Sequence, residues 1–219
     1  MAPKKKKQLK KGKRKVPRSL RVKKQKNLPK TLQQPYRVTY DPIEGEPLPE
    51  EVENQKEELH DLLLVNPKEA ILLLKPLKEK YSDVPLLYNW LSAAFSANGQ
   101  EEVAESIAKE NYEKNPYYLF AKLNYAEFCL KRGEFDEVSR IMEGKFDLKL
   151  LYPERDTFHI TEAVGFMSIA GKYFIAKEMI ESAQICYQAL MEIAPDHPST
   201  NQLMLLLAPS ALKALALMK

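Results

Sequence analysis

The chain has 219 residues, of which 44% are hydrophobic and 29% charged, a balance that suits one globular domain of moderate size with an extension. No apolar run approaches the roughly 20 residues that a membrane-spanning helix needs, and no apolar segment follows the basic N-terminus as it would in a signal peptide. The two cysteines, Cys129 and Cys186, lie far apart within helical patterns and are interpreted as buried apolar side chains in a reducing compartment. We therefore expect no membrane contact and a cytoplasmic location, or a nuclear one if the source is a eukaryote.

Positive charge is concentrated at the N-terminus. Residues 1–40 hold 16 of the 34 lysines and arginines and no acidic residue. The rest of the chain has 18 basic and 30 acidic side chains, a net charge of −12. Apolar residues in the first stretch are few and show no period, so residues 1–40 are predicted to form a basic, disordered arm.

Three roles remain open for this arm. It can contact phosphates of RNA, of the ribosome or of another nucleic acid, it can act as a nuclear localisation signal, or it can solubilise the chain and fold back on the acidic body. No aromatic residue precedes Tyr36, so contact with the nucleic-acid backbone is expected rather than base stacking. The candidate contacts are the basic side chains Lys4, Lys5, Lys6, Lys7, Lys10, Lys11, Lys13, Arg14, Lys15, Arg18, Arg21, Lys23, Lys24 and Lys26.

A proline-rich linker over residues 41–49 follows the arm. Each proline lacks a backbone donor and biases the preceding residue away from helix. Just before the linker, Tyr36, Val38 and Tyr40 alternate as in a short strand, although the stretch as a whole is irregular. We expect it to lie extended along the surface of the body.

Helical patterns begin near Glu50. The first helix is acidic early and apolar late, which suits the helix dipole. The second is expected to start with Asn66 as its cap and Pro67 at the first helical position, and to kink or end at Pro76. The closing segment from residue 198 is an apolar helix that we expect to be broken at Pro209 and to cap the end of a helical stack.

Between these segments, the chain shows three helical hairpins. The first spans residues 85–116 and turns at Asn98-Gly99, a pair that tolerates the positive φ needed to reverse the chain. The second turns at Gly133, and a linker over about residues 143–156 separates it from the third, which is expected from about Thr157 to Ile193. Small side chains such as Ser92 and Ala104 are expected where the paired helices approach closely.

The hairpins resemble tetratricopeptide repeats (TPR), and three units match the family pattern in phase over about half of the chain. The second unit has Lys122 where an aromatic residue is usual, and the third has Glu178 in place of the turn glycine. The matching residues are Tyr88, Leu91, Ser92, Phe95, Gly99, Ala104, Ala108 and Pro116, then Tyr125, Ala126, Cys129, Gly133, Phe135 and Val138, then Ala170, Gly171, Phe174, Ala183, Tyr187, Leu190 and Pro195.

The resemblance implies an all-α fold, a right-handed superhelical TPR-like solenoid over residues 50–219 behind a disordered N-terminal tail. Its parts are an atypical unit at 50–84, units at about 85–118, 119–152 and 157–197, and a C-terminal capping helix at 198–219. In this family the first helix of each pair lines a concave face that holds a peptide or a partner's helix. The matching positions here are mixed apolar and polar, and some of them can equally pack on the neighbouring repeat. The candidate partner-binding residues are Asn89, Ala93, Phe120, Leu123, Asn124, Glu127, Leu130, Lys131, Ser168 and Lys172.

One subfamily is excluded by these residues. Chaperone-binding TPR domains grip a C-terminal carboxylate with Lys, Asn and Arg, and of the matching positions only Asn124 conforms. Without the cations, the carboxylate would be desolvated unpaired.

The sequence shows no recognisable catalytic motif. Of the three histidines, His60 and His197 are interpreted as surface residues, and His159 with Glu162 is at most half of a metal site. No glycine-rich phosphate loop appears. We expect no enzymatic activity, no cofactor, no metal and no small-molecule substrate. The expected function is a scaffold or adaptor for a protein or peptide partner; the alternative is a nucleic-acid- or ribosome-associated protein anchored through the basic arm.

Overall fold

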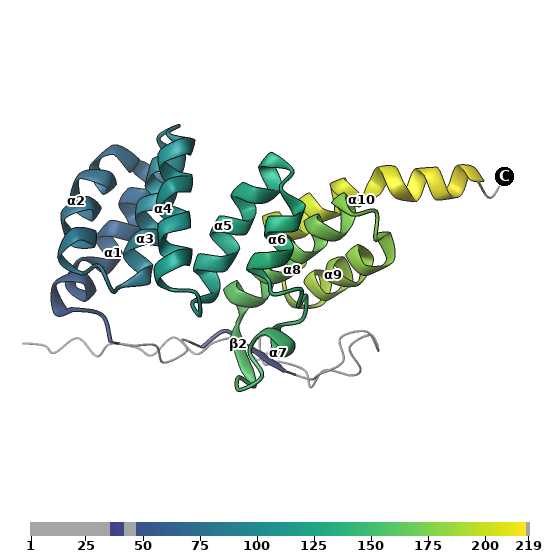
Figure 1. Cartoon of the computed structure of the whole chain (residues 1–219), viewed down its shortest axis with the longest axis horizontal. Coiled ribbons are helices and arrows are strands. Elements are labelled where there is room, and N and C mark those ends of the chain that lie inside the picture. Colours follow the sequence, from purple (N-terminus) through teal and green to yellow (C-terminus); the bar gives the residue numbers. More distant parts are fainter. Residues whose placement is uncertain (1–35, 42–46, 218–219) are drawn as a thin grey trace, which may run out of the picture.

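The computed structural model describes residues 36–41 and 47–217, and these residues are mostly helical. The expected all-α class is confirmed for this part of the chain. Most of the helices form antiparallel pairs that follow one another in a row (Figure 1). The pairs are α1 (Glu50–Val65) with α2 (Pro67–Lys80), α3 (Pro85–Ala97) with α4 (Glu101–Lys114), α5 (Leu119–Arg132) with α6 (Phe135–Ile141), and α8 (Ile160–Ala176) with α9 (Ile180–Ile193).

Packing between pairs follows a regular scheme. The first helices contact one another in the order α1, α3, α5 and α8, and the second helix of each pair contacts the first helix of the next. The last helix, α10 (Pro198–Leu217), packs against α8 and α9 and closes that end of the row (Figure 1). The first helices therefore lie side by side and form a continuous face.

The residues at the start of α2 and at two hairpin turns adopt the conformations expected from the sequence. Asn66 caps α2, because its side chain accepts a hydrogen bond from the backbone of Glu69 at 3.4 Å and its amide donates to the Glu69 carboxylate at 2.8 Å. Gly99 and Gly133 both adopt a φ of 75° at the hairpin turns. In the third hairpin, Glu178 takes the same left-handed conformation with a φ of 59°, so a side chain is held where glycine would be unstrained.

Two expected helix breaks do not occur. The helix α2 continues through Pro76 to Lys80, and α10 continues through Pro209 to Leu217. Leu74 and Leu77 on either side of Pro76 are buried, so packing across the proline offsets the lost backbone hydrogen bond. The expectations of an early end at Pro76 and a break at Pro209 were wrong.

Residues 36–41 belong to the fold. The strand β1 (Arg37–Thr39) pairs in parallel with β2 (Thr157–His159), with Val38 opposite Phe158. The alternation of Tyr36, Val38 and Tyr40 does correspond to a strand, whereas we expected an extended segment on the surface, and Tyr36 is buried. A disordered arm reaching to residue 40 is wrong for residues 36–40. The third hairpin also begins differently from the prediction, because Thr157–His159 is strand and the helix starts at Ile160.

Side chains fasten β1 to the third hairpin. Tyr36 is buried and meets Phe158 edge-on with ring centroids 5.3 Å apart, and burial raises its pKa. The Tyr40 hydroxyl donates to the carbonyl of Ile193 at 2.8 Å. The chain then reaches α1 at the far end of the row, so this short segment links the last helical pair to the first (Figure 1).

The linker after α6 also has structure. It contains a one-turn helix, α7 (Leu148–Leu151), in which Leu148 and Leu151 are buried and whose N-terminus is capped by Asp147. Lys122, which replaces the usual aromatic residue, is buried and donates to the carbonyl of Ile141 at 3.1 Å. It therefore stabilises the C-terminal end of the short helix α6.

Candidate interaction surface

Eight of the ten predicted partner-binding residues lie at least partly exposed on α3, α5 and α8. Ala93 and Lys131 are exposed and the others are half-buried. We call this set the first-helix face: Asn89, Ala93, Phe120, Asn124, Glu127, Leu130, Lys131 and Lys172.

The other two predicted residues are not available at the surface. Leu123 and Ser168 are only 4% and 6% exposed. A Cβ placed on Gly165 of α8 would lie 2.9 Å from a methyl carbon of Leu123, so the leucine fills the space between α5 and α8. Leu123 and Ser168 are therefore corrected from partner contacts to packing residues between neighbouring helices.

Hydrogen bonds and an ion pair join the first helices across this face. The Asn124 amide donates to the Asn89 side-chain oxygen at 2.9 Å, which connects α5 to α3. Lys172 of α8 reaches both carboxylate oxygens of Glu127 on α5, at 2.8 and 2.9 Å. Each pair holds two neighbouring helices in register, and the half-buried setting strengthens the ionic contact relative to open solvent.

Sequence reasoning missed the buried part of this amide network. Asn111 of α4 is 1% exposed, and its amide donates to Asn89 at 2.9 Å and to the carbonyl of Pro85 at 3.1 Å. The Asn115 amide donates to the Asn111 oxygen at 2.9 Å. The sequence does contain a sign that Asn111 is buried, because it follows Ala104, Ile107 and Ala108 at the spacing of one helix face. A polar residue there requires a partner.

Charge at the edge of the face is compensated. Lys131 lies 3.6 Å from Glu101, and Ser96 donates to the same carboxylate at 2.6 Å. The hydrogen bond from Ser96 is the largest single cause that lowers the pKa of Glu101, and Lys131 lowers it further. Together with the Glu127 and Lys172 pair, this leaves each charge of the first-helix face with an opposite partner.

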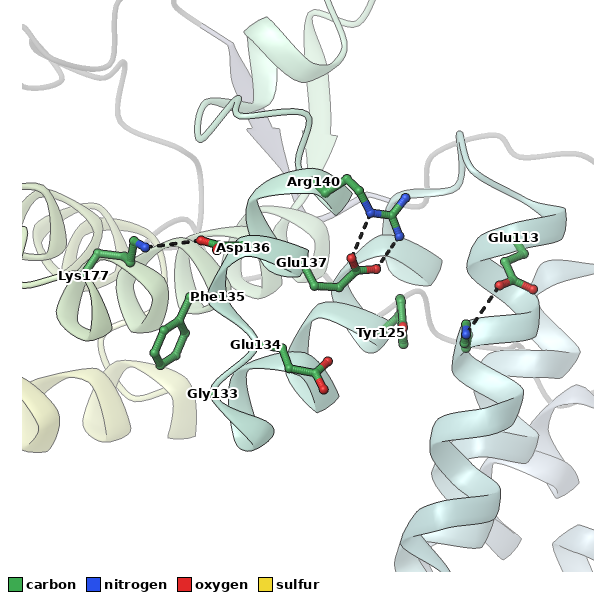
Figure 2. A pocket seen from close by; sticks show the side chains of 10 residues that line it. Glu113, Tyr125, Gly133, Glu134, Phe135, Asp136, Glu137, Arg140 and Lys177 are labelled. Atoms are coloured by element: carbon green, nitrogen blue, oxygen red, sulfur yellow. Dashed lines mark hydrogen bonds and ion pairs between the residues drawn. The ribbon is translucent and has the colours of Figure 1, made fainter.

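A shallow hollow lies on another part of the molecule, where the short helix α6 leaves space beside α4 and α5 (Figure 2). Its charged groups are paired: Arg140 with Glu137 and Lys177 with Asp136 within the lining, and Glu134 with Arg132 beside it. Arg140 holds the pKa of Glu137 below its usual range. Its lining residues are Lys109, Glu113, Tyr125, Gly133, Glu134, Phe135, Asp136, Glu137, Arg140 and Lys177. This mutual pairing gives the hollow little capacity to hold a charged ligand.

The histidine and carboxylate singled out in the sequence serve as a helix cap. The His159 ring accepts from the backbone of Thr161 at 3.3 Å, and Glu162 accepts from the backbone of His159 at 2.9 Å. Arg155 occupies the same carboxylate at 2.8 Å. The described residues include no group of three His, Cys, Asp or Glu side chains placed to hold a metal ion. Among their helices, none is sufficiently long and apolar to cross a membrane.

The predicted nucleic-acid contacts, Lys4 through Lys26, lie outside the described residues. No protein-family model, curated protein or solved structure gives a significant match to this chain.

Proposed function

We propose that this protein is a non-catalytic scaffold of TPR-like, right-handed superhelical architecture that holds a segment of a protein partner on the first-helix face. The observation that carries the proposal is the continuous row of first helices, α1, α3, α5 and α8. Side-chain bonds between α3 and α5 and between α5 and α8 make this surface rigid before any partner binds. A preorganised surface loses less conformational entropy on binding than a mobile one.

The chemistry of the face favours an apolar, uncharged segment. Phe120 and Leu130 are half-buried and present partial apolar surface, while Ala93 leaves room for a bulky side chain of the partner. A charged partner tail would compete with the existing pairs of Glu127 and Lys131 and would lose hydration without gaining a free counter-charge. A helix or strand with an apolar edge fits this surface better.

The test places an arginine on the first-helix face. Ala93→Arg adds a large cation to an exposed position of α3, and arginine is a good helix former, so the fold is expected to persist. The matched control is Ser106→Arg on the exposed side of α4, the other helix of the same pair. Each full-length chain is immobilised, exposed to nuclease-treated lysate, and compared by the amount of each captured protein.

We expect Ala93→Arg to reduce capture of the main partner by roughly tenfold or more, as loss of a central contact does in other interfaces, while Ser106→Arg leaves it unchanged. Far-UV circular dichroism and melting verify that both variants are folded. Equal capture by the two variants would show that the first-helix face is not the binding surface.

The basic arm supports a second candidate function, attachment to nucleic acid or to the ribosome. Its support is the run of cations without a single acidic residue before Asp41. The same capture experiment distinguishes the two functions. If nuclease releases all captured protein from the unmodified chain, the partners were tethered through nucleic acid and the arm is the working part. A cytoplasmic or nuclear location accompanies either proposal.

A further inference from the structure

The first half of α10 is fastened to the last helical pair, α8 with α9. Leu203 and Leu207 are buried, and a Cβ on Gly171 of α8 would lie only 2.5 Å from a methyl carbon of Leu203. The Thr200 hydroxyl donates to the carbonyl of Ala194 at 2.7 Å. These contacts fix the direction of the helix relative to α8 and α9.

The opposite side of the same turns is apolar and uncovered. Met204, Leu205 and Leu206 are 45%, 67% and 42% exposed, although they follow one another in a helix. Beyond them α10 runs past the ends of α8 and α9, away from the row (Figure 1). Between Leu203 and Leu217 the sequence contains a single ionisable residue, Lys213. A helix with so little charge is normally buried against another surface.

The chain itself does not provide a suitable cover. Residues 1–35 are rich in lysine and arginine, and covering leucines with them would remove ammonium groups from water without counter-charges. Residues 42–46 are tied between β1 and the start of α1 and include two glutamates. A membrane surface is disfavoured too, because interfacial helices carry many basic residues on their polar side, whereas α10 has only Lys213.

The opposite end of the row does not match α10 either. The outer side of α1 exposes five carboxylates, and among the residues that the structure describes only Glu53 of these has an ion-pair partner, Lys56 at 3.5 Å. Packing α10 of one molecule on α1 of the next would desolvate these groups against leucine. The five are Glu50, Glu53, Glu57, Glu58 and Asp61.

We propose that α10 is a self-association surface, on which the α10 helix of a second copy of this chain packs about a two-fold axis. Such an isologous contact places the same apolar patch on both sides and brings no acidic residue of α10 into the interface, because the helix has none. The free part of the helix after Leu203 is about 20 Å long at about 1.5 Å per residue. This length gives an interface at the small end of specific contacts, so we expect a weak, reversible dimer.

The experiment measures the mass of the full-length protein in solution, from low to several hundred micromolar, in high salt after nuclease treatment. These conditions prevent two basic arms from sharing one nucleic acid. The unmodified chain is expected to rise from 25.2 kDa toward twice that mass. Leu205→Glu places a carboxylate in both halves of the interface and is expected to raise the dissociation constant roughly a hundredfold. The matched control, Leu64→Glu, changes an exposed leucine of α1 that is 78% exposed and is expected to dimerise as before.

A second measurement locates the contact. Cys129 and Cys186 are buried, so a Leu205→Cys variant offers one accessible thiol among the described residues, and a bifunctional thiol reagent is expected to join two copies. An unmodified chain that stays monomeric at every concentration overturns the proposal, even if another protein is captured through Leu205. Continued dimerisation of Leu205→Glu, or equal loss in Leu64→Glu, overturns it as well.

Discussion

The attachment of β1 to the last helical pair, α8 with α9, predicts a large effect from a change outside the helices. Tyr36 is 8% exposed and packs edge-on against Phe158, which is fully buried. Replacing a buried aromatic residue by alanine costs about 3 to 5 kcal/mol of unfolding free energy. Because β1 has only three residues and can detach without the helices unfolding, we expect Tyr36→Ala to cost about 3 kcal/mol, the lower end of that range.

Urea unfolding followed by far-UV circular dichroism measures this effect. The loss of unfolding free energy on deleting residues 1–46 is the upper limit for Tyr36→Ala, because the tyrosine cannot contribute more than the whole segment that carries it. The matched control is Tyr40→Phe, which removes only the exposed hydrogen bond to Ile193 and is expected to cost about 1 kcal/mol or less. A Tyr36→Ala chain that unfolds within about 0.5 kcal/mol of the unmodified one would refute the view that β1 is an integral part of the fold.

The remaining predictions concern the end of the helical row and its thiols. Gly171→Ala is expected to destabilise the chain by about 1 to 2 kcal/mol, because the new methyl group meets Leu203. In a Leu203→Ala background the same change is expected to be stabilising, because the space is then free and alanine is the better helix former. An equal cost in both backgrounds would exclude this contact as the cause. Burial raises the pKa of Cys129 to about 11 and of Cys186 to about 12, so these thiols stay protonated in the folded chain when they ionise in the unfolded one. The contribution of the two thiols to the unfolding free energy is therefore fully present below about pH 8.5. Above that pH it is expected to fall by at most about 1.4 kcal/mol per pH unit for each thiol. Chemical unfolding between about pH 8.5 and 10 measures this loss, which is expected to be shallower when both cysteines are replaced by alanine.

The sequence was sufficient for the local elements of the fold. Apolar spacing placed the paired helices, and the glycines at 99 and 133 placed two of their turns. The close approach expected between Ser92 and Ala104 is also present, because the buried serine hydroxyl donates to the Ala104 carbonyl at 2.7 Å. These features depend on residues close together in the chain, where spacing and turn chemistry restrict the backbone directly.

The candidate interaction surface was predicted less completely. The resemblance to tetratricopeptide repeats placed Asn89 and Glu127 on the same side of the row, but it did not show that Leu123 is covered by α8 or that Asn111 reaches Asn89 from α4. Whether a side chain on a helix face meets solvent depends on the distance and angle of the next helix. That geometry is set by all of the packed side chains together.

The tertiary structure alone determined the long-range contacts. Val38 pairs with Phe158, although most of the folded sequence lies between them, and Leu203 of α10 lies over Gly171 of α8. A strand with a two-residue period fits any free edge of matching length, and a glycine in a helix shows that space is needed without showing what fills it. The partner in each case is selected by the burial that the complete fold offers, and this burial arises only when the distant segments have been brought together.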